Sequence, residues 1–171
     1  MPSITPFAEE HIPAVLDLWR ATEHIGLSSA DEPSALASFL RRNPGFSFVA
    51  TDNSHVVGAV LCGHDGRRGY IHHLAVSPSH RRRELGSKLL QCCLNVLACS
   101  GIQKCHAFVF HSNPNGALFW YLRDGRSVMI CSFSRRIPVA PNQSLERTPN
   151  DVAPFVCAKG ATSFAAAQLS R

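Results

Sequence analysis

The segment from residue 70 to residue 90 constrains the fold more than any other part of the chain. Residues 70–76 have the composition of a strand, Ser77-Pro78-Ser79 ends it, and Leu85 begins an amphipathic helix. Three consecutive arginines, at positions 81–83, lie in the turn between them. Backbone N–H groups at the start of a helix have no helical partners, and together with the arginines they suit a phosphate group. The segment therefore predicts an α/β fold with a phosphate-binding turn over residues 81–86.

The net charge narrows the class of partner. The 171 residues carry a formal charge of +5 with nine histidines counted as neutral, which favours an anionic partner. The basic residues form no long run and do not alternate with aromatic residues, so a compact phosphorylated ligand fits better than nucleic acid. No apolar stretch reaches the ~18 residues that span a bilayer, and the N-terminus lacks the pattern of a signal peptide. We therefore expect no membrane partner and a cytoplasmic location.

Seven cysteines raise two alternatives, a disulfide framework and a zinc site. Their number is odd, their spacing is irregular and no Cys-x-x-Cys pair occurs, so neither alternative is favoured. Cys92 and Cys93 fall within an apolar helical pattern, and Cys105 falls in a strand-like run. We expect buried reduced thiols and no metal site.

The rest of the chain shows helices and strands up to about residue 137. Hydrophobic periodicity and capping residues predict helices that begin near Glu9, after Pro33, at Leu85 and at Asn113. Alternation and turn residues predict strands over residues 3–5, 46–51, 55–62, 70–76, 105–110 and 127–133. Residues 138–171 have no sustained pattern. The sequence therefore predicts one domain over residues 1–137 and a weakly structured tail over residues 138–171.

Residues 74–90 read LAVSPSHRRRELGSKLL, and this string resembles the coenzyme A signature of the GNAT superfamily of N-acetyltransferases. In that signature an arginine or glutamine is followed by two variable residues, a glycine, one variable residue, and a glycine or alanine. Arg81 matches the first position and Gly86 matches the last. Glu84 stands where the family usually has its first glycine. A carboxylate and a restricted backbone at that position oppose phosphate binding.

The resemblance covers roughly Ile4 to Ile137 and implies a fold. The fold class is α/β (α+β), with a mixed, mostly antiparallel central sheet of six or seven strands flanked by helices. A V-shaped splay is expected between the strand that ends at Val76 and the strand that starts near Cys105, and the acetyl group lies there in the family. Residues 1–137 are then an acetyltransferase-like domain.

The resemblance also implies an activity. The family transfers the acetyl group of acetyl-coenzyme A, as co-substrate, to a primary amine of a small molecule or a protein. The sequence does not identify that amine, and a homodimer is left open. A non-catalytic coenzyme A-binding or regulatory domain is the alternative, and a basic nucleic-acid-binding module is a weaker one.

Most of the residues that would bind the coenzyme belong to the signature. The resemblance assigns this role to Leu74, Ala75, Val76, Arg81, Arg82, Arg83, Leu85, Gly86, Ser87 and Asn113. Of these, Val76 would also supply the backbone N–H that stabilises the oxyanion. Asn113 would contact the pantetheine arm, and as the residue that begins a helix it is also an N-cap candidate.

Two histidines, His72 and His73, fall where some members of the family place a catalytic carboxylate. Either could remove the proton from the amine, because imidazole titrates near neutrality. Strand alternation is expected to send them to opposite faces, so that at most one faces the substrate. His64 and Asp65 are further candidates, with ordinary turn chemistry as the alternative. Acidic and aromatic residues of the first helix–loop–helix would bind the acceptor: Trp19, Glu23, Asp31 and Glu32.

The acid that protonates the leaving thiolate is a tyrosine in many family members. Counting from Asn113 places the tyrosine position on Trp120, whereas counting back from Gly125 places it on Tyr121. Tryptophan cannot usefully donate a proton to sulfur. Tyr121 is therefore the candidate acid, with a core or rim aromatic as the alternative.

A shortened protein that ends at Ile137 tests the predicted division of the chain. We expect it to fold and to keep its affinity for acetyl-coenzyme A, because residues 138–171 lack periodicity and lie outside the resemblance. Thermal denaturation and a coenzyme titration, each beside the full-length chain, measure the two properties. Insolubility or a large fall in melting temperature would show that the tail packs on the domain.

Overall fold

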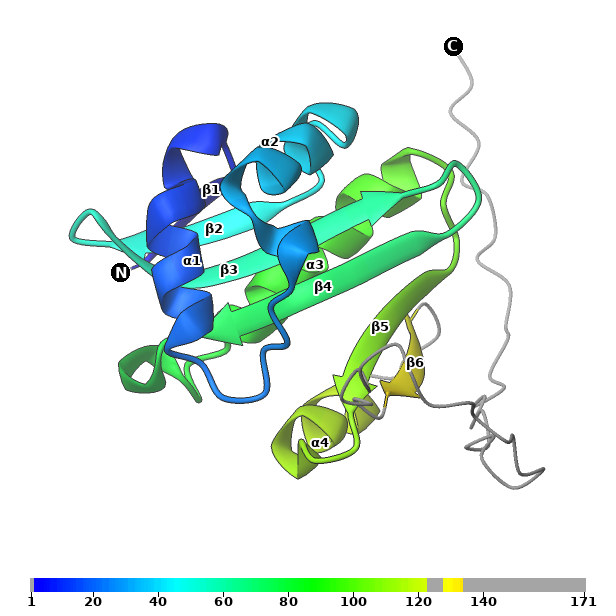
Figure 1. Cartoon of the computed structure of the whole chain (residues 1–171). Helices are drawn as coiled ribbons and strands as arrows, with labels where there is room; N and C mark the ends of the chain where they lie inside the picture. The colour runs from blue at the N-terminus through cyan, green and yellow to red at the C-terminus, as the bar shows by residue number, and fades with distance from the viewer. Residues whose placement is uncertain (1, 123–127, 134–171) are drawn as a thin grey trace, which may run out of the picture.

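A single sheet with the strand order β1-β2-β3-β4-β5-β6 organises the computed structural model, which describes residues 2–122 and 128–133 (Figure 1). The strands are β1 (Ser3–Pro6), β2 (Phe48–Asp52), β3 (His55–His64), β4 (Gly69–Val76), β5 (Cys105–Phe110) and β6 (Val128–Phe133). Neighbours from β1 to β4 pair antiparallel, whereas β4 with β5 and β5 with β6 pair parallel. The mixed sheet expected from the sequence is confirmed, with six strands among the described residues.

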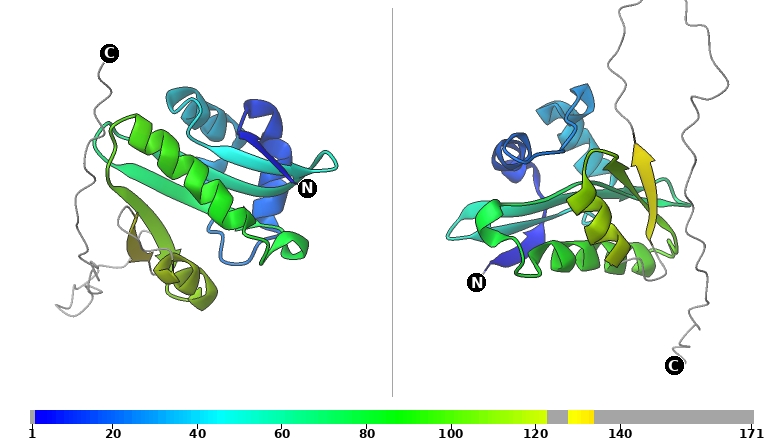
Figure 2. Two further views of the ribbon diagram at one scale, coloured as in Figure 1. Left: turned by 180° about the vertical axis from the view of Figure 1, so that it is seen from behind. Right: turned by 90° about the horizontal axis from the view of Figure 1, so that it is seen from below.

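Helices cover both faces of the sheet. The first face carries α1 (Ile12–Arg20) and α2 (Pro33–Arg42), and the opposite face carries α3 (Leu85–Cys99) (Figures 1 and 2). Short 3-10 turns, η1 (Glu9–His11), η2 (Ser29–Asp31) and η3 (Pro78–His80), precede the three helices. A fourth helix, α4 (Pro114–Leu122), follows β5.

Each face has its own apolar core. Val15, Leu16 and Trp19 of α1 are buried against the first face, because they recur at the spacing of one helical stripe. Leu89 and Cys93 of α3 are buried against the second face for the same reason. Helix α3 ends at Cys99, and Gly101 follows at a φ of 77°, the left-handed conformation that commonly terminates a helix.

The sheet opens between β4 and β5. The two strands pair only where Gly69–Ile71 lies beside Cys105–Ala107. Beyond that point β4 continues to Val76 and β5 to Phe110 without pairing to each other, and the ribbons diverge (Figure 1). The V-shaped splay expected from the resemblance is therefore present.

Cys62, Cys92, Cys93, Cys99 and Cys105 are free thiols, and three of them are buried: Cys62, Cys93 and Cys105. A hydrogen bond with the Cys62 thiol and burial raise the pKa of Cys93, and burial raises the pKa of Cys105 to about 12. The thiols of Cys93 and Cys105 therefore stay protonated, and all three buried cysteines pack as small apolar groups. Within residues 2–122 and 128–133 there is no cluster of three metal-ligating side chains and no helix with the length and hydropathy to cross a bilayer.

The elements begin close to their predicted positions. The predicted strand over residues 105–110 matches β5, and the helix predicted after Pro33 is α2. Predictions that involve residues 123–127 and 134–171, including the tail over residues 138–171, lie outside the described residues.

Candidate active site

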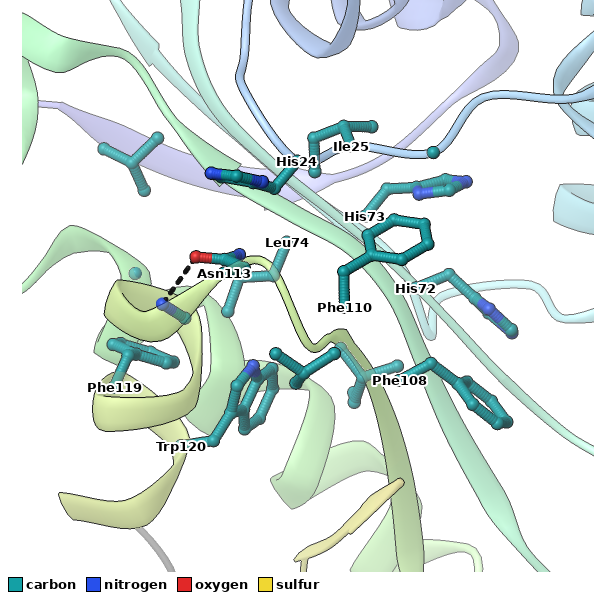
Figure 3. Close-up of a pocket in the computed structure, with 16 residues that line it drawn as sticks. His24, Ile25, His72, His73, Leu74, Phe108, Phe110, Asn113, Phe119 and Trp120 are labelled. Atoms are coloured by element: carbon teal, nitrogen blue, oxygen red, sulfur yellow. Dashed lines mark hydrogen bonds between the residues drawn. The ribbon is translucent and has the colours of Figure 1, made fainter. Parts of the chain in front are cut away.

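A cavity of about 410 Å³ occupies the splay (Figure 3). Its wall on the α1/α2 side consists of the loop over residues 24–26 with His72, His73, Phe108 and Phe110. Its wall on the α3 side comes from β4, β5, the start of α3 and α4, and consists of Ile71, Leu74, Val76, Gly86, Val109, Asn113, Gly116, Phe119 and Trp120. The cavity therefore runs through the sheet and joins the N-terminus of α3 to the pair of histidines.

A β-bulge brings the two histidines to one face. The register between β3 and β4 shifts between Ala59 and Leu61, so that His73 and Leu74 together oppose a single residue of β3. His73 has a φ of 46°, which lies in the left-handed region that most side chains avoid. A bulge adds one residue to a strand and interrupts its alternation.

The contacts of both rings confirm the effect of this bulge. The His72 ring lies 6.1 Å from the Phe39 ring of α2, and the His73 ring lies 4.9 Å from the Trp19 ring of α1. Both histidines thus face the side of the sheet that α1 and α2 cover, and both line the cavity. The expectation that alternation sends them to opposite faces is wrong, because the bulge cancels the alternation.

A buried carboxylate orients His73. Nε2 of His73 lies 2.7 Å from Oδ1 of Asp31, and only 7% of the Asp31 side chain is exposed. The other oxygen of Asp31 accepts hydrogen bonds from the backbone N–H of Ser28 at 2.8 Å and from its hydroxyl at 3.2 Å. Because a carboxylate only accepts, Nε2 of His73 carries the proton, and in the neutral ring Nδ1 holds the lone pair.

His72 is kept neutral by its surroundings. Burial lowers its pKa below the ordinary 6.5, and a charge on His73 would lower it further, whereas the charge of Asp31 raises it. Its ring stacks near the rings of Tyr70 and Phe108, at centroid distances of 6.4 and 6.0 Å. His72 is therefore an uncharged imidazole at neutral pH, next to the imidazole that Asp31 orients.

The arginine-rich turn leads from β4 into α3. Arg82 and Glu84 have φ values of 59° and 60°, so two residues with side chains occupy the left-handed region. The first intrahelical hydrogen bond runs from Lys88 N–H to Glu84 C=O at 3.0 Å, so the N–H groups of Leu85 and Gly86 lie ahead of it. The arginine side chains of this turn are exposed. This arrangement suits an anionic group over the helix N-terminus.

The end of β4 directs a backbone N–H into the splay. Ser77 donates its N–H to the carbonyl of Val57 on β3 at 2.9 Å. In an antiparallel pair successive residues turn their backbone groups to opposite sides, so those of Val76 face away from β3 and toward the splay. The Val76 carbonyl accepts a hydrogen bond from Nε of Arg81 at 3.0 Å. This bond ties the arginine-rich turn to the strand end.

Asn113 begins α4. Its side-chain oxygen accepts a hydrogen bond from the N–H of Gly116 at 2.8 Å, and its backbone carbonyl accepts one from Ala117 at 3.0 Å. The N-cap interpretation of Asn113 is confirmed. Asn113 also lines the cavity, so its amide lies beside the space that the splay opens.

The register of α4 decides which aromatic residue faces the cavity. Trp120 is buried with 8% exposure and lines the cavity. Tyr121 is 74% exposed on the outside of α4. The structure therefore agrees with the register counted from Asn113. Tyr121, which the sequence analysis proposed as the acid, points away from the cavity. The reason is the continuous helix from Pro114, which fixes the rotation of each later residue.

Comparison with known proteins agrees with this geometry. The profile of the acetyltransferase (GNAT) family matches residues 12–123. The chain belongs to this family. Among curated relatives, N-alpha-acetyltransferase 30 of Schizosaccharomyces pombe is 31% identical over 109 residues, which span 61% of this chain and 70% of the relative.

Solved structures share the GNAT fold. Ard1 from Thermoplasma volcanium superimposes with a TM-score of 0.65 at 18% identity, over 76% of this chain and 83% of Ard1. Diaminobutyrate acetyltransferase from Paenibacillus lautus, in complex with L-2,4-diaminobutyric acid and coenzyme A, superimposes with a TM-score of 0.63 at 20% identity. That match covers 72% of this chain and 74% of the other.

The signature residues divide into three groups in the structure of this GNAT domain. Leu74, Val76, Gly86 and Asn113 line the cavity. Ala75 and Leu85 are buried in the two cores, so only their backbones can serve a ligand. The remaining residues lie on the turn and the first turn of α3, with exposed side chains at Arg81, Arg82 and Arg83 and a half-buried one at Ser87.

Two of the four residues expected to bind the acceptor are buried. Trp19 is fully buried in the core, and Asp31 is buried against His73, so neither is a solvent-facing group that attracts a cation. Glu23 and Glu32 are exposed.

In the turn before β4, His64 accepts a hydrogen bond from Gly66 N–H, and the turn interpretation of that segment is confirmed.

Sequence reasoning missed a contact that closes one side of the cavity. A Cβ on Gly26 would lie 2.5 Å from Cζ of Phe110. Only a glycine therefore lets the loop over residues 24–26 pack this closely against the Phe110 ring. The contact joins residues that are far apart in the sequence. The sequence signals this contact only through Phe110, an apolar residue at the end of the predicted strand over residues 105–110.

Substitution of Glu84 by glycine tests the strained turn. A non-glycine residue in the left-handed region costs about 1–2 kcal/mol, of which part is offset by the greater freedom of glycine in the unfolded chain. We expect Glu84→Gly to raise stability by up to about 1 kcal/mol and to bind acetyl-coenzyme A as tightly or more tightly. Thermal denaturation with and without the coenzyme measures both effects.

Two further variants control this experiment. Arg82→Gly relieves the same backbone strain but removes a cation, so it should gain stability while it loses affinity. Arg83→Gly, at a residue outside the left-handed region, should gain nothing. A Glu84→Gly protein with several-fold weaker coenzyme binding would contradict the prediction.

The neutrality of His72 is directly measurable. In a titration of the histidine ring protons by NMR, assigned with His72→Gln, the His72 signal should move at a pH below 6.5. Asp31→Asn should lower this pKa further, because the charge of Asp31 raises it. A His72 pKa at or above 6.5 would show that burial does not control its protonation.

Proposed function

We propose that this GNAT protein is an N-acetyltransferase that transfers the acetyl group of acetyl-coenzyme A to a primary amine. One observation carries the proposal. The cavity through the sheet connects the N-terminus of α3 with two histidines, of which one is hydrogen-bonded to a buried aspartate. A phosphate-binding end and a proton-accepting end are the two requirements of this reaction.

The residues present fit the coenzyme. Its phosphates would lie over Arg81–Gly86, where cations and backbone N–H groups converge. The apolar wall formed by Leu74, Phe119 and Trp120, with the Asn113 amide beside it, would hold a narrow chain that carries amides. Acetyl-coenzyme A supplies the activated acetyl group, and residues of this chain bind the coenzyme and orient that group.

The acceptor must lose a proton before it reacts. An alkylammonium has a pKa near ~10 and is almost fully protonated at pH 7, so it has no lone pair for attack. We assign the removal of this proton to His73, whose Nδ1 holds the lone pair when Nε2 donates to Asp31. The proton passes directly or through a water molecule. Neutral His72, beside it on the same face, is the alternative base.

The bond changes then follow. The amine nitrogen attacks the thioester carbon, a C–N bond forms, and the carbonyl oxygen takes the negative charge. We assign stabilisation of that oxyanion to the backbone N–H of Val76, which faces the splay. The intermediate collapses with cleavage of the C–S bond and loses a second proton from its nitrogen to solvent, which yields an amide and a thiolate. The proton held by the imidazole leaves to the thiolate or to solvent.

Trp120 supports a second candidate function, a non-catalytic coenzyme-binding domain. It occupies the position where many family members have their acid, and the exposed Tyr121 cannot replace it. A thiol with a pKa near ~8.5 still departs as a thiolate at mildly basic pH, so the reaction does not require this acid. The amine acceptor of the diaminobutyrate acetyltransferase supports the enzymatic alternative.

Release of coenzyme A thiol, measured across a panel of primary amines, distinguishes the two functions. For an amine that reacts, we expect His73→Ala to lower kcat by roughly 10²–10⁴-fold, because a general base is lost. Asp31→Asn should lower kcat by at least about tenfold, since an asparagine can hold the wrong tautomer of His73. Both variants should bind acetyl-coenzyme A like the parent.

A matched control is Glu32→Gln, which neutralises the exposed neighbour of Asp31 and should leave kcat unchanged. His72→Ala separates the two histidines. If it loses activity while His73→Ala keeps the parent rate, His72 is the base. If no amine releases thiol although acetyl-coenzyme A binds, the protein is a coenzyme-binding domain.

A further inference from the structure

A row of aromatic rings continues from the cavity along the α1/α2 face of the sheet. It consists of Tyr70 and His72 of β4 with His106 and Phe108 of β5, and we call it the aromatic row. Successive ring centroids lie 5.6 Å apart from His106 to Tyr70, 6.4 Å from Tyr70 to His72 and 6.0 Å from His72 to Phe108. The interplanar angles of these pairs are between 17° and 23°.

The pairing of β4 and β5 produces this row. Tyr70 lies directly beside His106 in the parallel register, and residues two positions further on each strand return to the same face. The far end of the row is therefore at the closed end of the splay. His72 and Phe108, at the near end, line the cavity itself (Figure 3).

The row has one exposed ring and three half-buried rings, and its histidines are uncharged near neutral pH. Phe108 is 51% exposed, although it is a large apolar side chain. Burial lowers the pKa of His72 and, as the largest of several causes, the pKa of His106. An exposed aromatic side chain beside half-buried rings, at the edge of a reaction cavity, is typical of a binding site for an apolar part of a substrate.

The far end of the row has a positive environment. The charges of Arg68, Arg67 and Lys104 lower the pKa of His106, and the charge of Asp65 raises it. The Asp65 carboxylate already accepts hydrogen bonds from the backbone N–H groups of Arg67 and Arg68 and from the hydroxyl of Tyr70. A second cationic group on an acceptor would therefore be repelled here, and an anionic group would be attracted.

We propose that the acceptor is a primary amine that carries an aromatic group, which lies on the aromatic row, and an anionic group, which lies near Arg68. This inference rests on the proposed acetyl transfer and names the class of its substrate. The amine reaches the histidine pair, the ring contacts Phe108 and His72, and the negative group meets the cations at the far end. Polyamines and other polycations fit this surface poorly.

Three dipeptides with one primary amine each, and with the C-terminal carboxylate blocked as an amide, test the two parts of this substrate class. L-phenylalanyl-L-glutamate has both groups, L-phenylalanyl-L-arginine has a side chain of the opposite charge, and L-alanyl-L-glutamate has no ring. We expect kcat/KM for L-phenylalanyl-L-glutamate to exceed each of the others by at least about tenfold, which is the scale of one aromatic contact or one close charge pair.

Two variants connect this preference to the residues. Phe108→Ala should raise KM for L-phenylalanyl-L-glutamate by about tenfold with little change in kcat, and should raise KM for L-alanyl-L-glutamate far less. Arg68→Glu should lower the ratio of kcat/KM for L-phenylalanyl-L-glutamate to kcat/KM for L-phenylalanyl-L-arginine by about tenfold. The matched controls are Leu118→Ala, at an exposed apolar residue of α4, and Arg41→Glu, at an exposed arginine of α2. They should change neither the KM for L-phenylalanyl-L-glutamate nor the preference for it over L-phenylalanyl-L-arginine.

The outcomes separate this inference from the proposed function. Thiol release with equal rates for the three dipeptides, or with a preference for L-phenylalanyl-L-arginine, overturns the substrate class and leaves acetyl transfer intact. If none reacts, calorimetric titration of L-phenylalanyl-L-glutamate into the protein with coenzyme A decides. Binding that Phe108→Ala weakens supports the site even without turnover, and absence of binding overturns it.

Discussion

The short pairing between β4 and β5 is the constraint on which the rest of the structure depends. These strands share hydrogen bonds only over Gly69–Ile71 and Cys105–Ala107, and then separate. If the pairing continued, the backbone groups of Val76 would be occupied by β5, and side chains would close the cavity. The separation leaves polar backbone exposed to a ligand, and the cores on both faces of the sheet hold the strands in that position.

A second local device makes the open sheet chemically useful. The bulge at His73 places two adjacent histidines on one face, where a regular strand presents only one of them. A residue at positive φ is costly, and here the hydrogen bond of His73 to Asp31 and its contact with Trp19 hold it in place. Because Asp31 comes from the turn before α2, the same bond fixes the loop that borders the cavity.

Much of the fold follows from local patterns in the sequence. The periodicity of α3, its glycine after the last turn and the arginines before its first turn are properties of neighbouring residues, and the structure agrees with each of them. The position of the splay followed from the family resemblance. Tyr121 was misplaced because two spacings gave different registers, and only the continuous helix from Pro114 shows that Trp120 faces the cavity.

The sequence by itself determined the family, the order of the elements and the turn that suits a phosphate, because these depend on residue types at short spacing. Tertiary structure alone decided which histidine meets Asp31, that both histidines share a face, and that Tyr70, His72, His106 and Phe108 form one row. These features join segments that are tens of residues apart. Their contacts depend on strand register, on one bulge and on the angle of the splay, and none of these has a signature in adjacent residues.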